Sequence, residues 1–255
     1  MATERLDTTV ALITGASSGI GEAAALAFAA AGASVAVAAR RRERLDDLSG
    51  RIHQLGGKVL VIEADVTDET AARSAVARTV AEFGRLDTLV NNAGVMLLGP
   101  IVDADPGEWK RMIDLNVTAL LHTTHVALPH LLNAAETSPR RVADVVNISS
   151  VAGRVARSGS GVYNASKWAV NAFSESLRQE ITRRHVRVSL VEPGAVSTEL
   201  ASHNRPEIRE MMQQRFGSIE RLHADDIAEA ILYVVTRPRH VAINEILVRP
   251  TEQEA

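Results

Sequence analysis

The sequence predicts a single α/β domain in which one parallel sheet is covered by helices on both faces. Short runs rich in Val, Ile, Leu and Ala alternate with longer helical patterns along the chain. The runs are almost continuously apolar, which is typical of strands buried on both faces, and their alternation with helices predicts right-handed crossovers. No internal repeat or low-complexity linker divides the 255 residues, so one domain spanning residues 1–255 is expected.

Seven strands and six helices are expected. The strands lie near residues 9–14, 34–39, 58–63, 86–91, 142–149, 186–192 and 243–248. The helices lie near residues 19–31, 42–55, 68–83, 106–133, 160–184 and 225–236. The fourth helix has a clear start, since Asp105 is a capping residue, Pro106 suits the first helical position and Glu108 completes a capping box. Residues 195–224 contain no strand pattern, and a segment of that length is usually functional, so we predict a substrate lid there.

Composition excludes several classes of function. Hydrophobic residues make up 46% of the chain but aromatic residues only 3%, so aliphatic side chains must fill the core. With 28 basic and 31 acidic residues, the net charge of −3 gives no attraction to nucleic acid or to an anionic membrane. The chain has no cysteine, which excludes disulfides, zinc–thiolate sites and cysteine nucleophiles, and we expect no metal site. Neither a secretory signal nor a membrane-spanning run is visible, so we expect a cytoplasmic protein.

A glycine-rich turn follows the first predicted strand. It reads Thr14-Gly-Ala-Ser-Ser-Gly-Ile-Gly21 and leads directly into a helix. Glycines in such a turn let backbone amides approach a pyrophosphate, and the helix N-terminus favours its negative charge. The residues expected to bind a dinucleotide are Gly15, Ser17, Ser18, Gly19 and Ile20.

The same turn matches a second motif. Residues 15–19 also fit G-x-S-x-G, the nucleophile elbow of α/β-hydrolases, which would make Ser17 a nucleophile. That mechanism needs a later acid and histidine. The candidate histidines are His185, His203, His223 and His240. The hydrolase hypothesis leaves the motifs described next without a function.

The end of the second predicted strand indicates which dinucleotide binds. NAD-binding proteins place a carboxylate about 20 residues after the glycine turn to accept the ribose 2′-hydroxyl. Here the strand is followed by Arg40, Arg41 and Arg42. Guanidinium groups bind a 2′-phosphate, whereas basic residues at a helix N-terminus oppose the helix dipole and have little structural value. We therefore predict NADP(H) as the cofactor, with Arg40 and Arg41 on the phosphate and Arg42 turned to solvent or Glu43.

Two further strand ends fit a nucleotide lying across the edge of the sheet. Asp65 and Val66 follow the third strand, where the carboxylate could accept from an adenine amino group. Asn92, Ala93 and Gly94 follow the fourth strand, where small residues let the cofactor approach. Each segment on its own is also a plausible turn.

Three polar residues in the second half could move a proton. Tyr163 and Lys167 are four residues apart in a predicted helix, and Ser150 comes thirteen residues before Tyr163. Side chains at positions i and i+4 share one helix face, so the ammonium would lie beside the phenol. A free tyrosine has a pKa of about 10, and a nearby positive charge lowers it toward neutral pH. A hydroxyl from Ser150 could hold a substrate oxygen beside this pair.

The order of these motifs resembles that of the short-chain dehydrogenase/reductase family. It runs through Thr14-Gly-x-x-x-Gly-x-Gly21, Asn91-Asn-Ala-Gly94, Asn116, Ser150, Tyr163-x-x-x-Lys167 and Pro193-Gly194, and covers residues 8–250. The resemblance implies a doubly wound Rossmann sheet with strand order 3-2-1-4-5-6-7. It also implies a homotetramer, with helices 106–133 and 160–184 in one interface and the last strand in another.

The resemblance assigns a role to each matching residue. Tyr163 is the general acid/base, and Ser150 orients the substrate oxygen, while its neighbour Ser149 is structural. Lys167 lowers the pKa of Tyr163 and binds the nicotinamide ribose, and Asn116 holds a water that links Lys167 to solvent. The residues expected to line the nicotinamide are Pro193, Gly194, Val196 and Thr198.

The expected function is NADPH-dependent interconversion of a carbonyl compound and an alcohol. A narrower similarity, in segments 96–100, 150–155, 171–175, 225–230 and 244–251, is to clavulaldehyde reductases and to NADP-dependent 3-hydroxy acid and serine dehydrogenases. Pocket specificity is expected from residues 94–100, 151–157 and 198–222, with Arg154 and Arg157 either on a substrate carboxylate or at the surface. The alternative function is a nucleotide-sensing binding protein without turnover.

Overall fold

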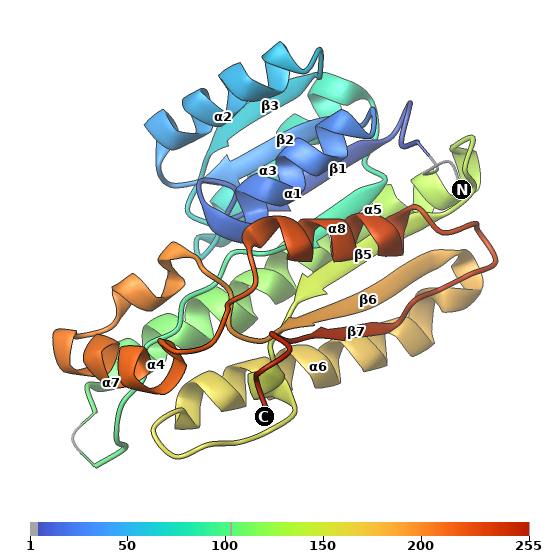
Figure 1. Cartoon of the computed structure of the whole chain (residues 1–255). Helices are drawn as coiled ribbons and strands as arrows, with labels where there is room; N and C mark the ends of the chain where they lie inside the picture. Colours follow the sequence, from blue (N-terminus) through green and yellow to red (C-terminus); the bar gives the residue numbers. More distant parts are fainter. Residues whose placement is uncertain (1–4, 103, 255) are drawn as a thin grey trace.

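A computed structural model describes residues 5–102 and 104–254 and contains a seven-stranded parallel sheet (Figure 1). Residues 1–4 lie outside the described residues. They belong to the N-terminal segment in which the sequence shows no secretory signal. The order of the strands is β3-β2-β1-β4-β5-β6-β7, which confirms the expected doubly wound topology. The strands are β1 Val10–Thr14, β2 Ser34–Ala39, β3 Val59–Glu63, β4 Thr88–Asn91, β5 Ala143–Ile148, β6 Val186–Pro193 and β7 Glu245–Val248.

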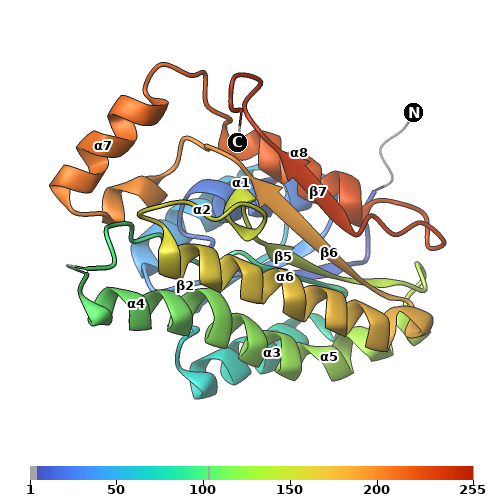
Figure 2. The same ribbon diagram turned by 90° about the horizontal axis from the view of Figure 1, so that it is seen from below.

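Helices cover both faces of the sheet, as the alternation of strands and helices predicted. One face carries α1, α2 and α8, and the other carries α3, α5 and α6; Figure 2 shows the molecule from below, with α3, α5 and α6 on the lower side of the sheet. The helices are α1 Gly19–Ala30, α2 Arg42–Gln54, α3 Glu69–Phe83, α4 Pro106–Ile113, α5 Ala119–Thr137, α6 Gly161–Ile181, α7 Pro206–Phe216 and α8 Ala224–Val235.

The core consists of two aliphatic layers, one on each side of the sheet. Successive side chains of a strand point to opposite faces. In β2, Val35 and Val37 therefore pack into the layer under α1 and α8, while Ala36 and Ala38 pack into the layer under α3 and α5. Because both of their faces are buried, the central strands β1 and β2 are apolar along almost their whole length, which explains why they were visible in the sequence.

The predicted helix 106–133 is two helices joined by a wide π-helical turn, Asp114–Thr118. Its start is as predicted at Asp105, whose carboxylate accepts from Gly107 N at 2.8 Å, with Pro106 in the first turn. The predicted capping box is wrong, because Glu108 pairs with Arg205 of the lid, 3.6 Å away. A π-turn inserts an extra residue and lets the two helices face different neighbours.

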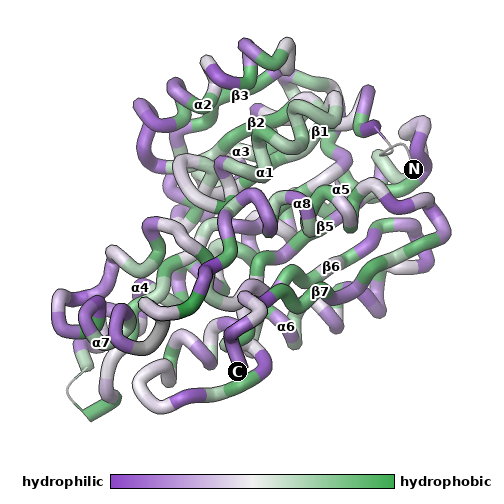
Figure 3. The backbone as a smooth tube through the Cα atoms, in the orientation of Figure 1, coloured by the Kyte–Doolittle hydropathy of each residue, from purple (hydrophilic) through white to green (hydrophobic). Residues whose placement is uncertain are grey.

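Residues 195–224 contain more regular structure than the sequence indicated. A short 3₁₀ segment, Glu199–His203, is followed by α7, which lies near α4 at one end of the molecule (Figure 1). The strands are largely hydrophobic, whereas α7 is largely hydrophilic (Figure 3). We call residues 199–217 the lid from here on.

Candidate active site

The predicted site residues gather at the carboxyl ends of the strands, around a cavity of about 1120 Å³. This is the position at which doubly wound sheets bind their ligands. Of the predicted residues, Asn116 alone lies behind the wall. The lining includes Gly15, Ser17, Ser18, Gly19, Ile20, Arg40, Arg41, Asp65, Val66, Asn92, Ala93, Gly94, Ser150, Tyr163, Lys167, Pro193, Gly194, Val196 and Thr198.

The glycine turn between β1 and α1 leaves no room for side chains. Gly15 has φ = 67°, and a Cβ built on it would lie 2.8 Å from the Ala93 backbone. Gly19 has φ = 57°, and a Cβ there would lie 3.1 Å from Thr198. The first turn of α1, with its backbone N–H groups, therefore lies open to the cavity. A pyrophosphate fits this cradle.

Arg41 lies across the two serines of the turn. Its Nε and Nη2 donate to Ser17 Oγ at 3.2 and 3.0 Å, and Nη2 also donates to Ser18 Oγ at 2.8 Å. Its Nη1 donates to Glu199 Oε2 of the lid at 2.8 Å. A guanidinium has no acceptor and stays protonated, so it cannot activate Ser17 as a base. This geometry argues against the hydrolase hypothesis and for an anion site.

The other two arginines differ from each other. Arg40 Nη1 lies 3.9 Å from Asp65 Oδ2, so it reaches the end of β3 as a nucleotide-binding residue would. Arg42 was expected to turn to solvent or Glu43; its side chain is 54% exposed, as the first alternative predicted, and its partner is Asp46 instead of Glu43. Its Nε donates to both oxygens of Asp46 at 2.9 Å, one helical turn further along α2. Residues i and i+4 are neighbours on a helix, so this pair needs no ligand.

Lys167 and Tyr163 share one face of α6, as their spacing predicted. The Lys167 Nζ lies 5.9 Å from the centre of the Tyr163 ring and donates to Ile148 O at the end of β5, 2.8 Å away. Burial lowers the pKa of Lys167 to about 8. A lysine with such a pKa still carries its charge at neutral pH and can hold hydroxyl groups.

Tyr163 differs from the expectation in the direction of its pKa. Burial among apolar residues such as Val95 and Met112 raises the pKa of the phenol, and a hydrogen bond with Ser150 opposes the shift only in part. The pKa of Tyr163 is therefore raised overall, whereas Lys167 was expected to lower it. Desolvation disfavours a phenolate more than one hydrogen bond favours it.

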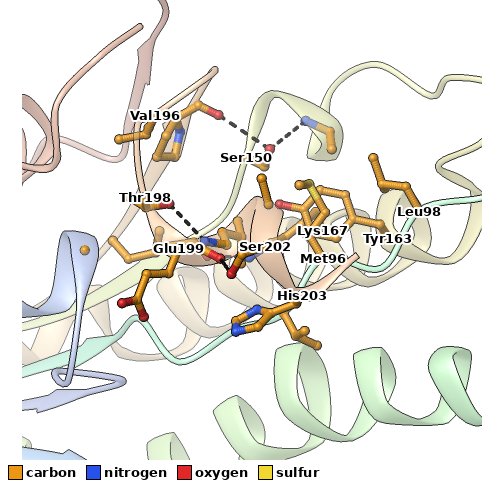
Figure 4. Close-up of a pocket in the computed structure, with 18 of the residues that line it drawn as sticks. Met96, Leu98, Ser150, Tyr163, Lys167, Val196, Thr198, Glu199, Ser202 and His203 are labelled. Atoms are coloured by element: carbon orange, nitrogen blue, oxygen red, sulfur yellow. Dashed lines mark hydrogen bonds between the residues drawn. The ribbon is translucent and has the colours of Figure 1, made fainter. Parts of the chain in front are cut away.

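The Ser150 hydroxyl lies beside the Tyr163 phenol and is fixed by neighbouring backbone groups. Its Oγ accepts from Ala152 N at 3.1 Å, which caps a short 3₁₀ segment, and approaches Pro193 O at 3.4 Å (Figure 4). Ser149 points elsewhere, donating to Asn171 Oδ1 at 2.5 Å, which agrees with the structural role expected for it. Both serines line the cavity, but the hydroxyl of Ser149 is bonded to Asn171, whereas that of Ser150 lies beside Tyr163.

Asn116 is central to the π-turn and fully buried. Its Oδ1 accepts from Val95 N at 2.8 Å, and its Nδ2 donates to Val95 O at 2.9 Å and to Ser166 Oγ at 3.1 Å. These bonds fix the chain just after Gly94, where a Cβ would come within 4.0 Å of Lys167 Nζ. Asn116 thus positions a wall of the cavity near Lys167.

The segment after β6 lines the opposite wall. Gly194 N continues the pairing of β6 with β7, donating to Val248 O at 2.7 Å. Val196 then bridges to Leu222, which follows the lid in the chain, and Thr198 Oγ1 accepts from Leu200 N at 3.4 Å. The expected nicotinamide residues therefore connect the sheet to the base of the lid.

The part of the cavity next to Tyr163 is walled mainly by apolar side chains. Met96 and Leu98 lie beside Tyr163 in Figure 4. Other apolar residues that line the cavity include Val151, Val155, Leu200, Ile208, Met211 and Met212. Of the two arginines considered for a substrate carboxylate, Arg157 lines the cavity, whereas Arg154 is paired with Glu192 at 2.8 Å and with Glu245.

Sequence reasoning missed two polar residues of the lid. Glu199 binds Arg41, as described above. Asn204 is buried and ties the lid to the segment after β4, accepting from Leu98 N at 2.7 Å and donating to Met96 O at 3.0 Å. The available signal was weak, since Asn204 and Arg205 precede a Pro206-Glu207 helix start.

The described residues contain neither a cluster of metal ligands nor a helix suited to cross a membrane. In residues 5–102 and 104–254, His, Asp and Glu side chains do not form a group of three or more that could hold a metal ion. Within the same ranges, none of the helices is both long and apolar enough to cross a membrane.

Comparison with known proteins agrees with this geometry. The family model described as short chain dehydrogenase matches residues 9–209. An uncharacterized oxidoreductase of Staphylococcus aureus is 36% identical over 241 residues, covering 94% of this chain and 96% of the relative. Serine dehydrogenase complexed with NADP⁺ is 32% identical over 97% of both chains, with a TM-score of 0.88. A 7α-hydroxysteroid dehydrogenase complexed with NADH is 30% identical, with coverage of 96% of this chain and 94% of that chain and a TM-score of 0.83.

Proposed function

The chain belongs to the short-chain dehydrogenase family, and from that premise we propose that it interconverts a carbonyl compound and an alcohol with NADP(H). The observation that carries the proposal is the buried Tyr163 phenol, beside Ser150 and Lys167, in the same cavity as the glycine cradle. A cofactor at that cradle and an acid beside its far end are the two parts that hydride transfer requires.

Each of the proposed catalytic residues would have a separate role. The bound nicotinamide supplies or accepts the hydride. Ser150 would orient the substrate oxygen and Tyr163 would transfer the proton at that oxygen. Lys167 would hold ribose hydroxyls with its ammonium, whose position is set by Ile148 O. Asn116 would keep the wall at Gly94 in place for this lysine and hold a water on its path to solvent.

The direction of the Tyr163 shift keeps the phenol in the form that donates a proton, as carbonyl reduction requires. With its pKa raised by burial, the phenol keeps its proton at neutral pH and can donate it to an alkoxide at once. Oxidation of an alcohol needs the phenolate first, so it would require a higher pH.

The choice of NADP(H) rests on the residues after β2. Arg41 and Ser18 would bind the 2′-phosphate from the side of the glycine turn, and Arg40 from the side of β3. The NADP⁺ bound to serine dehydrogenase supports this choice, although the related hydroxysteroid dehydrogenase is complexed with NADH. Asp65 and Val66 would hold the adenine.

The walls near Tyr163 indicate a substrate with an apolar body. Met96, Leu98, Met211 and Met212 offer a deformable apolar surface. An aliphatic or aromatic aldehyde or ketone fits this surface better than a small polar hydroxy acid. The carboxylate of such an acid would need Arg157 as its partner.

We also propose a homotetramer. Trp168 on the outer face of α6 is 50% exposed, and Leu247 of the edge strand β7 is 44% exposed. Large apolar side chains and an open sheet edge at these places support interfaces through α4–α6 and through β7. Light scattering at working concentration tests the assembly, and a monomer would contradict it.

The function is tested by following NADPH absorbance with a panel of aldehydes, ketones and 3-hydroxy acids, with NADH in parallel. We expect turnover of apolar aldehydes or ketones with NADPH. Tight NADPH binding without turnover over the whole panel would instead support a nucleotide-sensing protein.

A further inference from the structure

Glu199 takes up one side of the guanidinium group that the proposed 2′-phosphate needs. Arg41 donates to Ser17 and Ser18 through Nε and Nη2, and to Glu199 through Nη1 at 2.8 Å. The other carboxylate oxygen of Glu199 lies 3.6 Å from Arg44 Nη2. In Figure 4 the Glu199 side chain points away from Ser150 and Tyr163. It therefore serves the nucleotide end of the cavity and not the reacting end.

The positive charge of this cluster is too small to balance both the Glu199 carboxylate and a phosphate. Three guanidinium groups, of Arg40, Arg41 and Arg44, face two carboxylates, of Asp65 and Glu199. A phosphate monoester brings a charge of about −2 at neutral pH. If Glu199 stayed bound to Arg41 beside the phosphate, the net charge of the cluster would be negative, and the carboxylate and the phosphate would repel each other. If the Glu199 carboxylate moved away, the net charge of the cluster would be close to zero.

We propose that the Glu199 carboxylate and the 2′-phosphate of the nucleotide exclude each other at Arg41. The inference rests on the NADP(H) proposal above and adds two consequences to it. Glu199 weakens the binding of 2′-phosphorylated nucleotides without opposing unphosphorylated ones. Binding of the phosphate also releases the first turn of the lid from the body of the domain.

The release follows from where Glu199 lies in the chain. It is the first residue of the 3₁₀ segment Glu199–His203, directly after Thr198 in the cavity wall. The far end of that segment is fixed at Asn204, which binds Met96 and Leu98. Loss of the Arg41 bond would therefore free one end of the turn while the other remains anchored.

The test compares adenosine 2′,5′-bisphosphate with adenosine 5′-monophosphate, by calorimetry, on wild type, Glu199→Gln and Glu136→Gln. Glu136 is a matched control, because it also pairs with an arginine, Arg184, and its substitution removes the same charge outside the cavity. We expect Glu199→Gln to bind the bisphosphate about fivefold tighter, which equals ~1 kcal/mol for an exposed ion pair, with the monophosphate unchanged. Glu136→Gln should match wild type for both ligands.

Hydrogen exchange gives a second readout that does not depend on affinity. Saturating bisphosphate should speed exchange over residues 199–203 in wild type, whereas in Glu199→Gln the same amides should exchange fast with or without the ligand. Equal bisphosphate affinity in wild type and Glu199→Gln, or slower exchange on binding, would overturn the exclusion while leaving NADP(H) binding intact. If wild type binds both nucleotides equally well, the NADP(H) proposal itself fails and the inference fails with it.

Discussion

The groups that would carry out the chemistry and the lid beside them are held in different ways. Asn116, Ser150, Tyr163 and Lys167 are each at most 9% exposed and are fixed by bonds to neighbouring strands and turns. Much of the lid is exposed, including Met211 at 46%, and it is tied to the domain by polar side chains such as Glu199 and Asn204. Buried groups with several partners resist change, whereas exposed segments open at low free energy.

This difference separates reaction from recognition. In the proposed function, the geometry of proton transfer depends on the sheet and α6, in which most substitutions would cost folding free energy. The choice of substrate and nucleotide would depend on the lid and on Arg41, where side chains can change with little effect on folding. Four experiments test this separation.

Removing the proton donor should have the largest effect. Tyr163→Phe keeps the ring in its apolar site and removes the hydroxyl, so turnover should fall about 10³-fold while NADPH affinity is largely retained. Tyr233→Phe is the matched control, since Tyr233 is 50% exposed on α8 and packs under Arg237. Steady-state kinetics and calorimetry measure both quantities. Full activity in Tyr163→Phe would remove the basis of the assignment.

Arg41→Ala should weaken NADPH binding about 10- to 100-fold, because charge-assisted hydrogen bonds are lost, with a much smaller change for NADH. Arg40→Ala should have a weaker effect of the same kind, since Arg40 is more exposed and lies 3.9 Å from its partner Asp65. Fluorescence titration with both nucleotides gives the ratio of the dissociation constants for NADPH and NADH in each variant. Equal losses for NADPH and NADH would mean that Arg41 supports the fold rather than the 2′-phosphate.

Lys167 should make stability depend on pH. Its pKa is about 8 in the folded state against an ordinary value of 10.5, so the unfolded chain binds more protons between these values and stability rises with pH. The free energy of unfolding should increase by about 2 kcal/mol from pH 8 to pH 10. Above pH 10 the raised pKa of Tyr163 acts in the opposite direction, because the folded state then holds the extra proton.

Urea unfolding of wild type and Lys167→Met at pH 8, 9 and 10 measures this dependence. The substitution removes the titrating group and should flatten the profile. Parallel profiles for the two proteins would show that Lys167 is not desolvated as its burial indicates.

Asn204→Ala should have the smallest effect on activity, because it loosens the lid and does not touch the reacting groups. It leaves Leu98 N and Met96 O without a partner, so KM for the carbonyl substrate should rise about tenfold with kcat little changed. Gln214→Ala, at an exposed position of α7, is the control. A fall in kcat with unchanged KM would mean that Asn204 affects the reacting groups and that lid and reaction are not separate.

The sheet and most of the site could be predicted because local patterns determine them. Strand β2 was placed at its observed limits, since parallel burial demands an apolar run bounded by polar residues. The glycine turn, Ser150 and the Tyr163–Lys167 pair were visible through spacing, because each depends on neighbours within one turn or one helix.

The remaining features depend on segments far apart in the chain. The raised pKa of Tyr163 comes from packing against Val95 and Met112, which spacing on α6 cannot reveal. Helix α7 has a polar sequence without a clear apolar stripe, so only Pro206 at its start marked it. The Arg41–Glu199 bond joins residues 158 positions apart. Such pairs follow from the fold and leave no local pattern.

The π-turn Asp114–Thr118 has a consequence for changes in chain length. Its extra residue sets the rotational phase between α4, which faces α6, and α5, which faces the sheet. Deleting one residue there would turn all of α5 by about 100° relative to α4, the angle between successive residues of a helix. Either Asn116 would leave Val95 or the buried side of α5 would rotate away from the core. Insertions and deletions should therefore be tolerated at the lid long before they are tolerated in this single turn.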